Sequence, residues 1–252
     1  MTPIQRFYQW VIDSPSLLEL RSPISDLSVF SSNHRLDDTH TYQGNPRLGF
    51  LYQHLCEQVI NSSPNHAITH DEIQINVDGR TLGAIDFIVE NQQSNLLEHW
   101  EVAIKFYLLH GDIWFGPNSH DQLDKKLERM LNHQLAMSSS SAFVEQYPEL
   151  QTASEHLLMQ GRLYINPFLD QSVPTECLGH KINSSQVNGF WCYKSQVHLI
   201  EEALYPINKD QWAAGTDNFD GEPIKEFGER FIHAQTNTGQ FWFVMPESWP
   251  HN

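Results

Sequence analysis

The spacing of apolar residues predicts a helix after an irregular beginning. Residues 1–46 contain helical fragments broken by Ser-Pro pairs, and we interpret them as an irregular lead-in. From Leu48 to Val59 apolar residues recur at helical spacing, and Pro46 stands at a first-turn position that favours proline. The pattern therefore predicts the first regular element as a helix over about 46–60.

The following segment has the pattern of a hairpin and a third strand. Apolar and polar residues alternate over 73–77, and Asp78-Gly79 is a pair that tight two-residue turns prefer. A return strand is expected over about 81–89. The strand expected over about 97–108 has large apolar side chains on one face. Three consecutive strands are therefore predicted.

A helix over about 119–137 and a strand over 162–165 complete the predicted core. Later segments resemble additions to the same sheet, namely a strand over 190–193, a helix near 196–204 and a last strand over 240–245. The order is helix, three strands, helix, strand, with C-terminal additions. This order predicts an α/β protein with a mixed central sheet flanked by helices.

No segment has the composition of a linker, so we predict one domain over 1–252. Within it, 1–46 is the lead-in, 47–165 the core and 166–252 a C-terminal elaboration. The 40% of apolar and 18% of charged residues exclude a disordered chain.

Charge and processing signals narrow the expected partners. With 31 acidic and 15 basic residues the net charge is −16, which argues against broad, non-specific binding of duplex nucleic acid. No apolar run is long enough to span a membrane, the beginning of the chain lacks the features of a secretory signal, and the three cysteines form no disulfide pattern. We therefore expect a cytoplasmic protein without a membrane partner. A structured or partner-delivered nucleic acid remains possible, and a protein partner is left open.

Several common catalytic motifs are absent. The sequence has no G-x-G-x-x-G, P-loop, G-x-S-x-G, H-E-x-x-H or paired C-x-x-C motif. Dinucleotide oxidoreductases, P-loop ATPases, α/β-hydrolases and zincins are therefore disfavoured.

The remaining candidate chemistry is an acidic pair followed by a lysine on neighbouring strands. Asp86 lies among apolar residues of the second strand, and a carboxylate there is costly unless a cation or metal pairs with it. Glu101 and Lys105 share a face of the third strand, with Ala103 between them. Two converging carboxylates suit Mg²⁺ or Mn²⁺, and a nearby lysine can position water or stabilise charge. His99 lies on the same face as Glu101, where a chance placement is the simpler interpretation.

This order of elements, with an acid on strand two and an acid and a lysine on strand three, resembles the PD-(D/E)XK (restriction-endonuclease-like) nuclease core over roughly residues 47–165. A second resemblance, to an uncharacterised bacterial family called domain of unknown function 1853, spans nearly the whole chain. It is carried by the phrases RTLGAIDFIV, HWEVAIKFYL, WFGPN, DQLDKKLERMLNHQL, GRLYINP and FWFVMPESWP. That family implies membership of the nuclease-like superfamily and no established activity.

The nuclease resemblance implies roles for six residues. Asp86 matches the strand-two acid and, with Glu101, would bind the metal, whereas Lys105 would complete the catalytic group. Gln134 and Lys126 on the second helix resemble residues that orient the phosphate. On the first helix Gln53 is a possible contributor to the site, although its neutral amide is a weaker ligand than the glutamate of many superfamily members. The other departures are the four-residue spacing from Glu101 to Lys105, where the superfamily has two, and the alanine at 103.

Two functions are consistent with these residues. The first is a metal-dependent phosphodiesterase or nuclease of the PD-(D/E)XK type acting on nucleic acid. The second is a catalytically inactive nuclease-like fold that serves as a binding or scaffold protein, so whether the chain is an enzyme stays open here.

Overall fold

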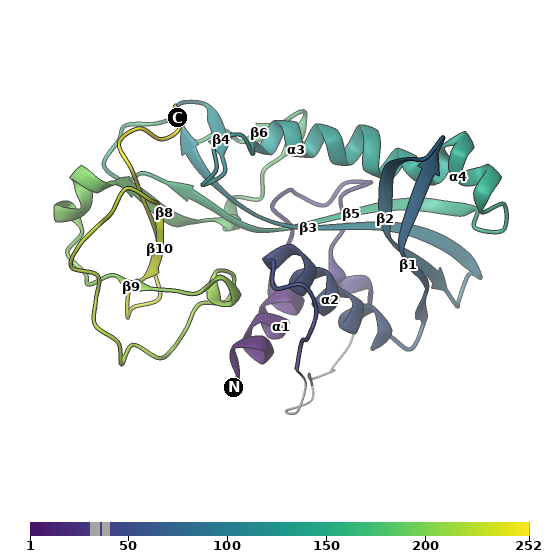
Figure 1. Ribbon diagram of the computed structural model, residues 1–252, viewed down its shortest axis with the longest axis horizontal. Helices are drawn as coiled ribbons and strands as arrows, with labels where there is room; N and C mark the ends of the chain where they lie inside the picture. Colours follow the sequence, from purple (N-terminus) through teal and green to yellow (C-terminus); the bar gives the residue numbers. More distant parts are fainter. Residues whose placement is uncertain (31–35, 37–40, 252) are drawn as a thin grey trace. The chain divides into compact units, whose positions relative to one another are not determined.

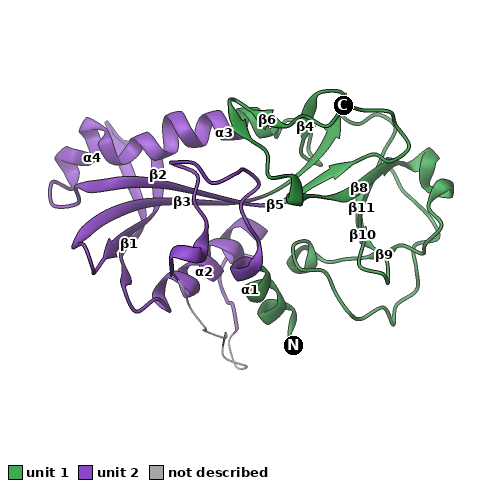
Figure 2. Cartoon of the chain, turned by 180° about the vertical axis from the view of Figure 1, so that it is seen from behind, with its two compact units in different colours: residues 1–10, 105–125, 161–252 green, residues 11–104, 126–160 purple. Residues whose placement is uncertain are grey.

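The computed structural model divides the chain into two compact units, coloured separately in Figure 2. The described residues are 1–30, 36 and 41–251. Unit 1 comprises residues 1–10, 105–125 and 161–252, and unit 2 comprises residues 11–104 and 126–160. The predicted lead-in falls partly on 31–35 and 37–40, which lie outside the described residues.

Helical segments and strands occur in runs along the chain (Figure 1). The label η marks the 3₁₀ helices and the one π-helical segment, η2. The helical segments are α1 (Pro3–Asp13), η1 (Leu27–Phe30), α2 (Leu48–Asn61), α3 (Leu123–Arg129), η2 (Met130–Gln134), η3 (Leu135–Ser139), α4 (Ser141–Gln146), η4 (Ser184–Gln186), η5 (Lys194–Leu199) and η6 (Lys209–Gln211). The strands are β1 (His66–Val77), β2 (Arg80–Asn91), β3 (Leu96–His110), β4 (Ile113–Phe115), β5 (Thr152–Ile165), β6 (Glu176–Cys177), β7 (His180–Lys181), β8 (Val187–Tyr193), β9 (Tyr205–Pro206), β10 (Ile232–Gln235) and β11 (Phe241–Met245).

Each unit contains a sheet of hydrogen-bonded strands. In unit 2 the hydrogen-bonded order is β1-β2-β3-β5, and in unit 1 it is β3-β5-β8-β11-β10-β9, because β3 and β5 contribute residues to both units. Strand β8 is parallel to β5 and β11, whereas β1, β2 and β3 pair in antiparallel fashion. The predicted mixed α/β class is therefore confirmed.

The β1–β2 hairpin of unit 2 turns where the sequence predicts. Asp78 and Gly79 both have positive φ angles, 48° and 75°, and a two-residue turn of this kind matches the twist of the flanking strands. Val77 pairs with Arg80 across the turn. Asp and Gly accept positive φ more readily than other residues, so this dipeptide sets the register of both strands.

Helices cover both faces of the sheet in unit 2 (Figure 2). Helix α2 covers one face and buries an apolar stripe that includes Tyr52 and Leu55. The segment from η2 to α4 covers the other face, where Met137 and Phe143 pack with Ile85 of β2. Strand β3 lies between these layers, which explains why residues on both of its faces are buried.

Unit 1 is built around aromatic residues and one buried arginine. The guanidinium of Arg162 donates hydrogen bonds to Asn188 Oδ1 and to two backbone carbonyls, and it stacks 3.5 Å above the ring centroid of Phe241. His233 stacks on Phe243 at 4.0 Å, and its Nε2 lies 2.9 Å from the Tyr164 hydroxyl. The positive charge of Arg162 is tolerated in the interior because the N–H donors of its guanidinium have hydrogen-bond partners.

The predicted core elements are all present, but β4 lies between β3 and α3 and α4 lies before β5, where neither was predicted, and the extents of the elements differ. Among the residues before 46, α1 is a helix that ends just before Ser14-Pro15, and its amphipathic face buries Phe7 and Val11. The helix expected over 119–137 is α3 followed by a π turn and a 3₁₀ turn. The helix expected near 196–204 is the short η5, because Ile200 adopts an extended backbone.

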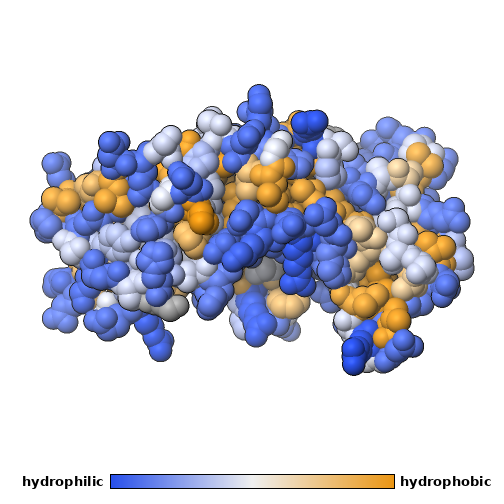
Figure 3. Space-filling model, turned by 90° about the horizontal axis from the view of Figure 1, so that it is seen from above, coloured by the Kyte–Doolittle hydropathy of each residue, from blue (hydrophilic) through white to orange (hydrophobic). Residues whose placement is uncertain are grey.

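The surface and the thiols agree with the expectations from composition. The face seen in Figure 3 carries mainly hydrophilic side chains, with hydrophobic ones in separate groups. Cys56, Cys177 and Cys192 are free. In the described part of the chain, no helix combines the length and the apolar character needed to cross a membrane.

Candidate acidic site between two strands

Asp86 and Glu101 lie next to each other in unit 2, where the pairing of β2 with β3 gives way to side-chain hydrogen bonds. The ladder runs from Asn91 and Leu96 to Phe87 and Trp100. At the next position the backbone N–H of Val102 donates to Asp86 Oδ2 at 2.9 Å, and the N–H of Asp86 donates to Glu101 Oε1 at 3.4 Å. The carboxylates thus accept from backbone donors at the point where the ladder ends, which keeps these buried N–H groups satisfied.

Glu101 is fixed from two further directions. Gln134 Nε2 donates to Glu101 Oε2 at 3.2 Å and to the carbonyl of Ala84 at 3.1 Å, so the π-helical segment orients the carboxylate. His99 Nε2 lies 3.0 Å from Glu101 Oε1. The other ring nitrogen of His99, Nδ1, lies 2.9 Å from Ser138 Oγ. Glu101 is only 1% exposed and His99 is fully buried, so the carboxylate depends on these partners in place of water.

Burial determines the protonation of the site. It raises the pKa of Asp86, and the adjacent Glu101 charge raises it further. Burial also raises the pKa of Glu101, although the hydrogen bond from Gln134 opposes this rise. The pKa of His99 is lowered to about 4, because burial disfavours the imidazolium more than the nearby carboxylates favour it. At neutral pH His99 is therefore neutral, with one nitrogen as donor and the other as acceptor.

The donor set fits a divalent cation held by two carboxylates. Asp and Glu oxygens are hard ligands, and Mg²⁺ is commonly held by one or two carboxylates while it keeps several waters. Among the described residues no group of three or more His, Cys, Asp and Glu side chains is arranged as a metal site. A cation at this position would have Asp86 and Glu101 as its protein ligands, and water or substrate oxygens would supply the others.

The remaining predicted residues lie in three different settings. The positive charge of Lys126 lowers the pKa of both Asp86 and Glu101, which places its ammonium near the acidic pair. Gln53, in α2, donates to Glu72 Oε1 at 3.5 Å. Lys105 belongs to unit 1.

The ammonium of Lys105 is paired within unit 1. Lys105 Nζ lies 2.6 Å from Asp121 Oδ2, and the hydroxyl of Tyr107 donates to the other oxygen of Asp121 at 3.1 Å. Asp121 thus holds the side chains of Lys105 and Tyr107, both in β3, in place. Its partnership with Lys105 is a contact that strand spacing alone did not indicate.

Sequence reasoning missed the roles of His99 and Ser138. The i, i+2 spacing of His99 and Glu101 was a usable signal, because such residues share a strand face. Ser138 lies in a run of four serines, where nothing in the sequence distinguishes it from its neighbours.

The fold and this site define a mixed α/β protein with a buried acidic pair. A family model described as "Domain of unknown function (DUF1853)" matches residues 6–237, so the chain belongs to that family. A comparison with the curated proteins finds no match. A comparison with the solved structures finds no match either.

Proposed function

We propose that this chain is a metal-dependent phosphodiesterase acting on nucleic acid, with Asp86 and Glu101 as ligands of Mg²⁺ or Mn²⁺. The observation that carries the proposal is the acidic pair itself. Two carboxylates are held side by side in a buried position where both pKa values are raised. Perturbed groups of this kind concentrate at functional sites, and a divalent cation would relieve the repulsion between them.

The neighbouring side chains suit this chemistry. A divalent cation held there would activate water and neutralise charge on a phosphodiester. Gln134 holds Glu101 in one orientation. Lys126 adds a positive charge near the pair, where it can bind a substrate phosphate.

The restriction-endonuclease-like core is part of the same proposal. The order of α2, β1, β2, β3, the α3 segment and β5 supports it, as does the position of the acids on β2 and β3. In this proposal Lys105 stabilises charge on the substrate, which requires its ammonium to exchange Asp121 for a phosphate oxygen. The net charge of −16 favours a structured substrate over arbitrary duplex DNA, and a cytoplasmic location remains a prediction.

A second candidate is a binding or scaffold protein that retains the fold without catalysis. The observation that favours it is the Lys105–Asp121 ion pair, which occupies the lysine that catalysis would need. The alanine at position 103 and the Gln53–Glu72 contact agree with this alternative.

Mn²⁺ binding and hydrolysis, measured on the same samples, separate the two candidates. Calorimetry should detect Mn²⁺ binding to the full chain, and labelled single-stranded DNA, duplex DNA and RNA should reveal Mg²⁺-dependent cleavage. Asp86→Asn and Glu101→Gln should each weaken Mn²⁺ binding at least tenfold and abolish cleavage. Glu90→Gln, on the same strand but outside the pair, is the matched control and should change neither. Metal binding without cleavage of any substrate, or no metal binding at millimolar Mn²⁺, would favour the scaffold.

A further inference from the structure

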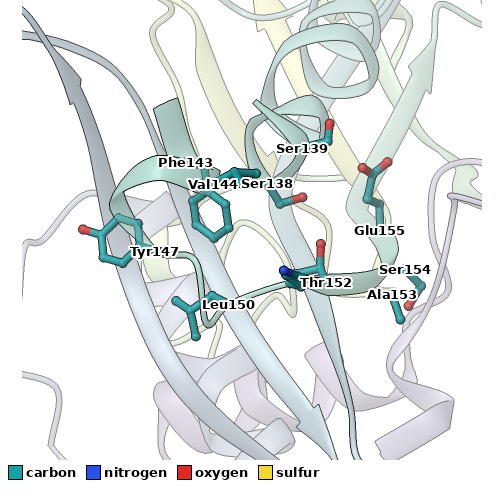
Figure 4. A pocket seen from close by; sticks show the side chains of 11 residues that line it. Ser138, Ser139, Phe143, Val144, Tyr147, Leu150, Thr152, Ala153, Ser154 and Glu155 are labelled. Atoms are coloured by element: carbon teal, nitrogen blue, oxygen red, sulfur yellow. The ribbon is translucent and has the colours of Figure 1, made fainter. Parts of the chain in front are cut away.

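A pocket of about 470 Å³ opens in unit 2 between η3, α4 and the beginning of β5 (Figure 4). The side chains that line it come from the continuous stretch 138–155. In Figure 4 the rings of Phe143 and Tyr147 lie on one side, with the hydroxyl of Ser138 and the carboxylate of Glu155 on the other. The volume falls within the range of small-molecule sites, roughly 300–1,000 Å³.

The lining of the pocket has a definite chemical character. Phe143 and Tyr147 have ring centroids 5.4 Å apart and, with Leu150, supply an aromatic and apolar wall. Glu155 carries the only charge in the lining, and no Lys, Arg or His contributes to it. An anionic group would be repelled here, whereas a flat, neutral group with N–H donors would be accepted.

Glu155 is a suitable acceptor for such donors. Its side chain is half-buried, and its carboxylate accepts no hydrogen bond from the described residues. A carboxylate binds most strongly to two parallel N–H donors, one for each oxygen. Among the common nucleobases only guanine presents two adjacent N–H donors on one edge, whereas adenine and cytosine place an acceptor beside the amino group and uracil flanks its N–H with carbonyls.

The pocket is connected to the acidic pair through one imidazole. Ser138, on the pocket wall, lies 2.9 Å from His99 Nδ1, and His99 Nε2 lies 3.0 Å from Glu101. Two hydrogen bonds and one ring therefore separate the pocket from the carboxylates to which we assign the metal.

We propose that this pocket binds a guanine base of the substrate, with its N1–H and amino group on Glu155 and its face against Tyr147. The inference rests on the proposed function, since it assigns the base that accompanies the phosphate at the acidic pair. It adds a preference for guanine, which the acidic pair alone does not provide. Thr152 also lines the pocket, and its hydroxyl would be a donor for the acceptor edge of the base.

Nucleoside binding to the full chain without metal tests the proposal. Guanosine, inosine, cytidine and uridine are titrated and followed by NMR chemical shifts; inosine is guanosine without the amino group. Guanosine should bind about tenfold or more tightly than inosine, because one charge-assisted hydrogen bond is lost. Glu155→Gln should remove this preference, whereas Glu149→Gln, an exposed glutamate outside the pocket, should keep it. Tyr147→Leu should weaken all nucleosides similarly through lost stacking.

The possible results separate this inference from the proposed function. No guanosine binding at 1 mM, or a guanosine preference that survives Glu155→Gln in a folded variant, would overturn it. Thermal melting establishes that each variant is folded. Mn²⁺ binding is measured on the same variants: if it is intact while guanosine fails to bind, only the pocket assignment is wrong. Guanosine binding in a chain that binds no Mn²⁺ supports the pocket and refutes the metal site.

Discussion

Asp86→Asn should stabilise the metal-free protein at neutral and alkaline pH. The asparagine keeps an oxygen that accepts from the backbone N–H of Val102, and it removes one of two like charges in a buried site. Because burial and the Glu101 charge raise the folded-state pKa of Asp86 above its unfolded value of 3.8, the folded chain binds this proton more tightly. The contribution of Asp86 to the free energy of unfolding should therefore fall as the pH rises from about 4 towards 8, and it is measured as the difference between the wild type and Asp86→Asn.

The expected size of the effect follows from the same linkage. The folded-state pKa of Asp86 is raised from 3.8 to about 8. Each pH unit of such a rise corresponds to about 1.4 kcal/mol of destabilisation at a pH where the group is charged, and for a domain of this size each kcal/mol shifts the melting temperature by about 2–4 °C. Asp86→Asn should thus melt higher than the wild type at pH 8 without metal, by at least about 4–8 °C. At pH 4 the two proteins should melt together, because Asp86 is then protonated.

The assay is thermal melting of both proteins from pH 4 to pH 8, with and without Mg²⁺. A ligand at ten times its Kd stabilises the native state by about 1.4 kcal/mol. Mg²⁺ should therefore raise the melting temperature of the wild type and leave Asp86→Asn unchanged. A variant that melts lower than the wild type at pH 8 without metal would refute the reasoning, because it would show that the Asp86 charge is stabilising.

Three further substitutions test the packing of unit 1. Gly161→Ala should cost about 3 kcal/mol in chemical denaturation, because a Cβ would lie 1.6 Å from the backbone oxygen of Lys105; Gly221→Ala, in open space, is the control and should cost little. Arg162→Lys should cost about 2–3 kcal/mol, since buried carbonyls lose their donors, and a loss below 0.5 kcal/mol would contradict this. Burial and the Arg162 charge hold the pKa of His233 well below 6.5, so the contribution of His233 to stability should decline as the pH falls below about 6.5. His233→Gln should flatten that decline in urea titrations, and an unchanged slope would refute the assignment.

The local pattern of apolar, polar and turn residues was sufficient to predict the strands that carry Asp86 and Glu101. Asp78-Gly79 between alternating strands gave the hairpin, because these residues accept the positive φ angles of a tight turn. The apolar surroundings of Asp86 on the second strand also indicated a costly carboxylate. Local signals failed where a helix changes its winding: the predicted helix over 119–137 contains a π turn that brings Gln134 to Glu101.

The sequence by itself determined the core helices and strands along the chain, the turn of the first hairpin and the presence of two acids on consecutive strands, since these depend on periodicity and turn chemistry. Only the tertiary structure decided their partners. His99 reaches Ser138 across 39 residues and Glu101 reaches Gln134 across 33, while Lys105 pairs with Asp121. Contacts between distant residues depend on how helices pack on the sheet, and burial of the carboxylates, which sets their pKa values, arises only from that packing.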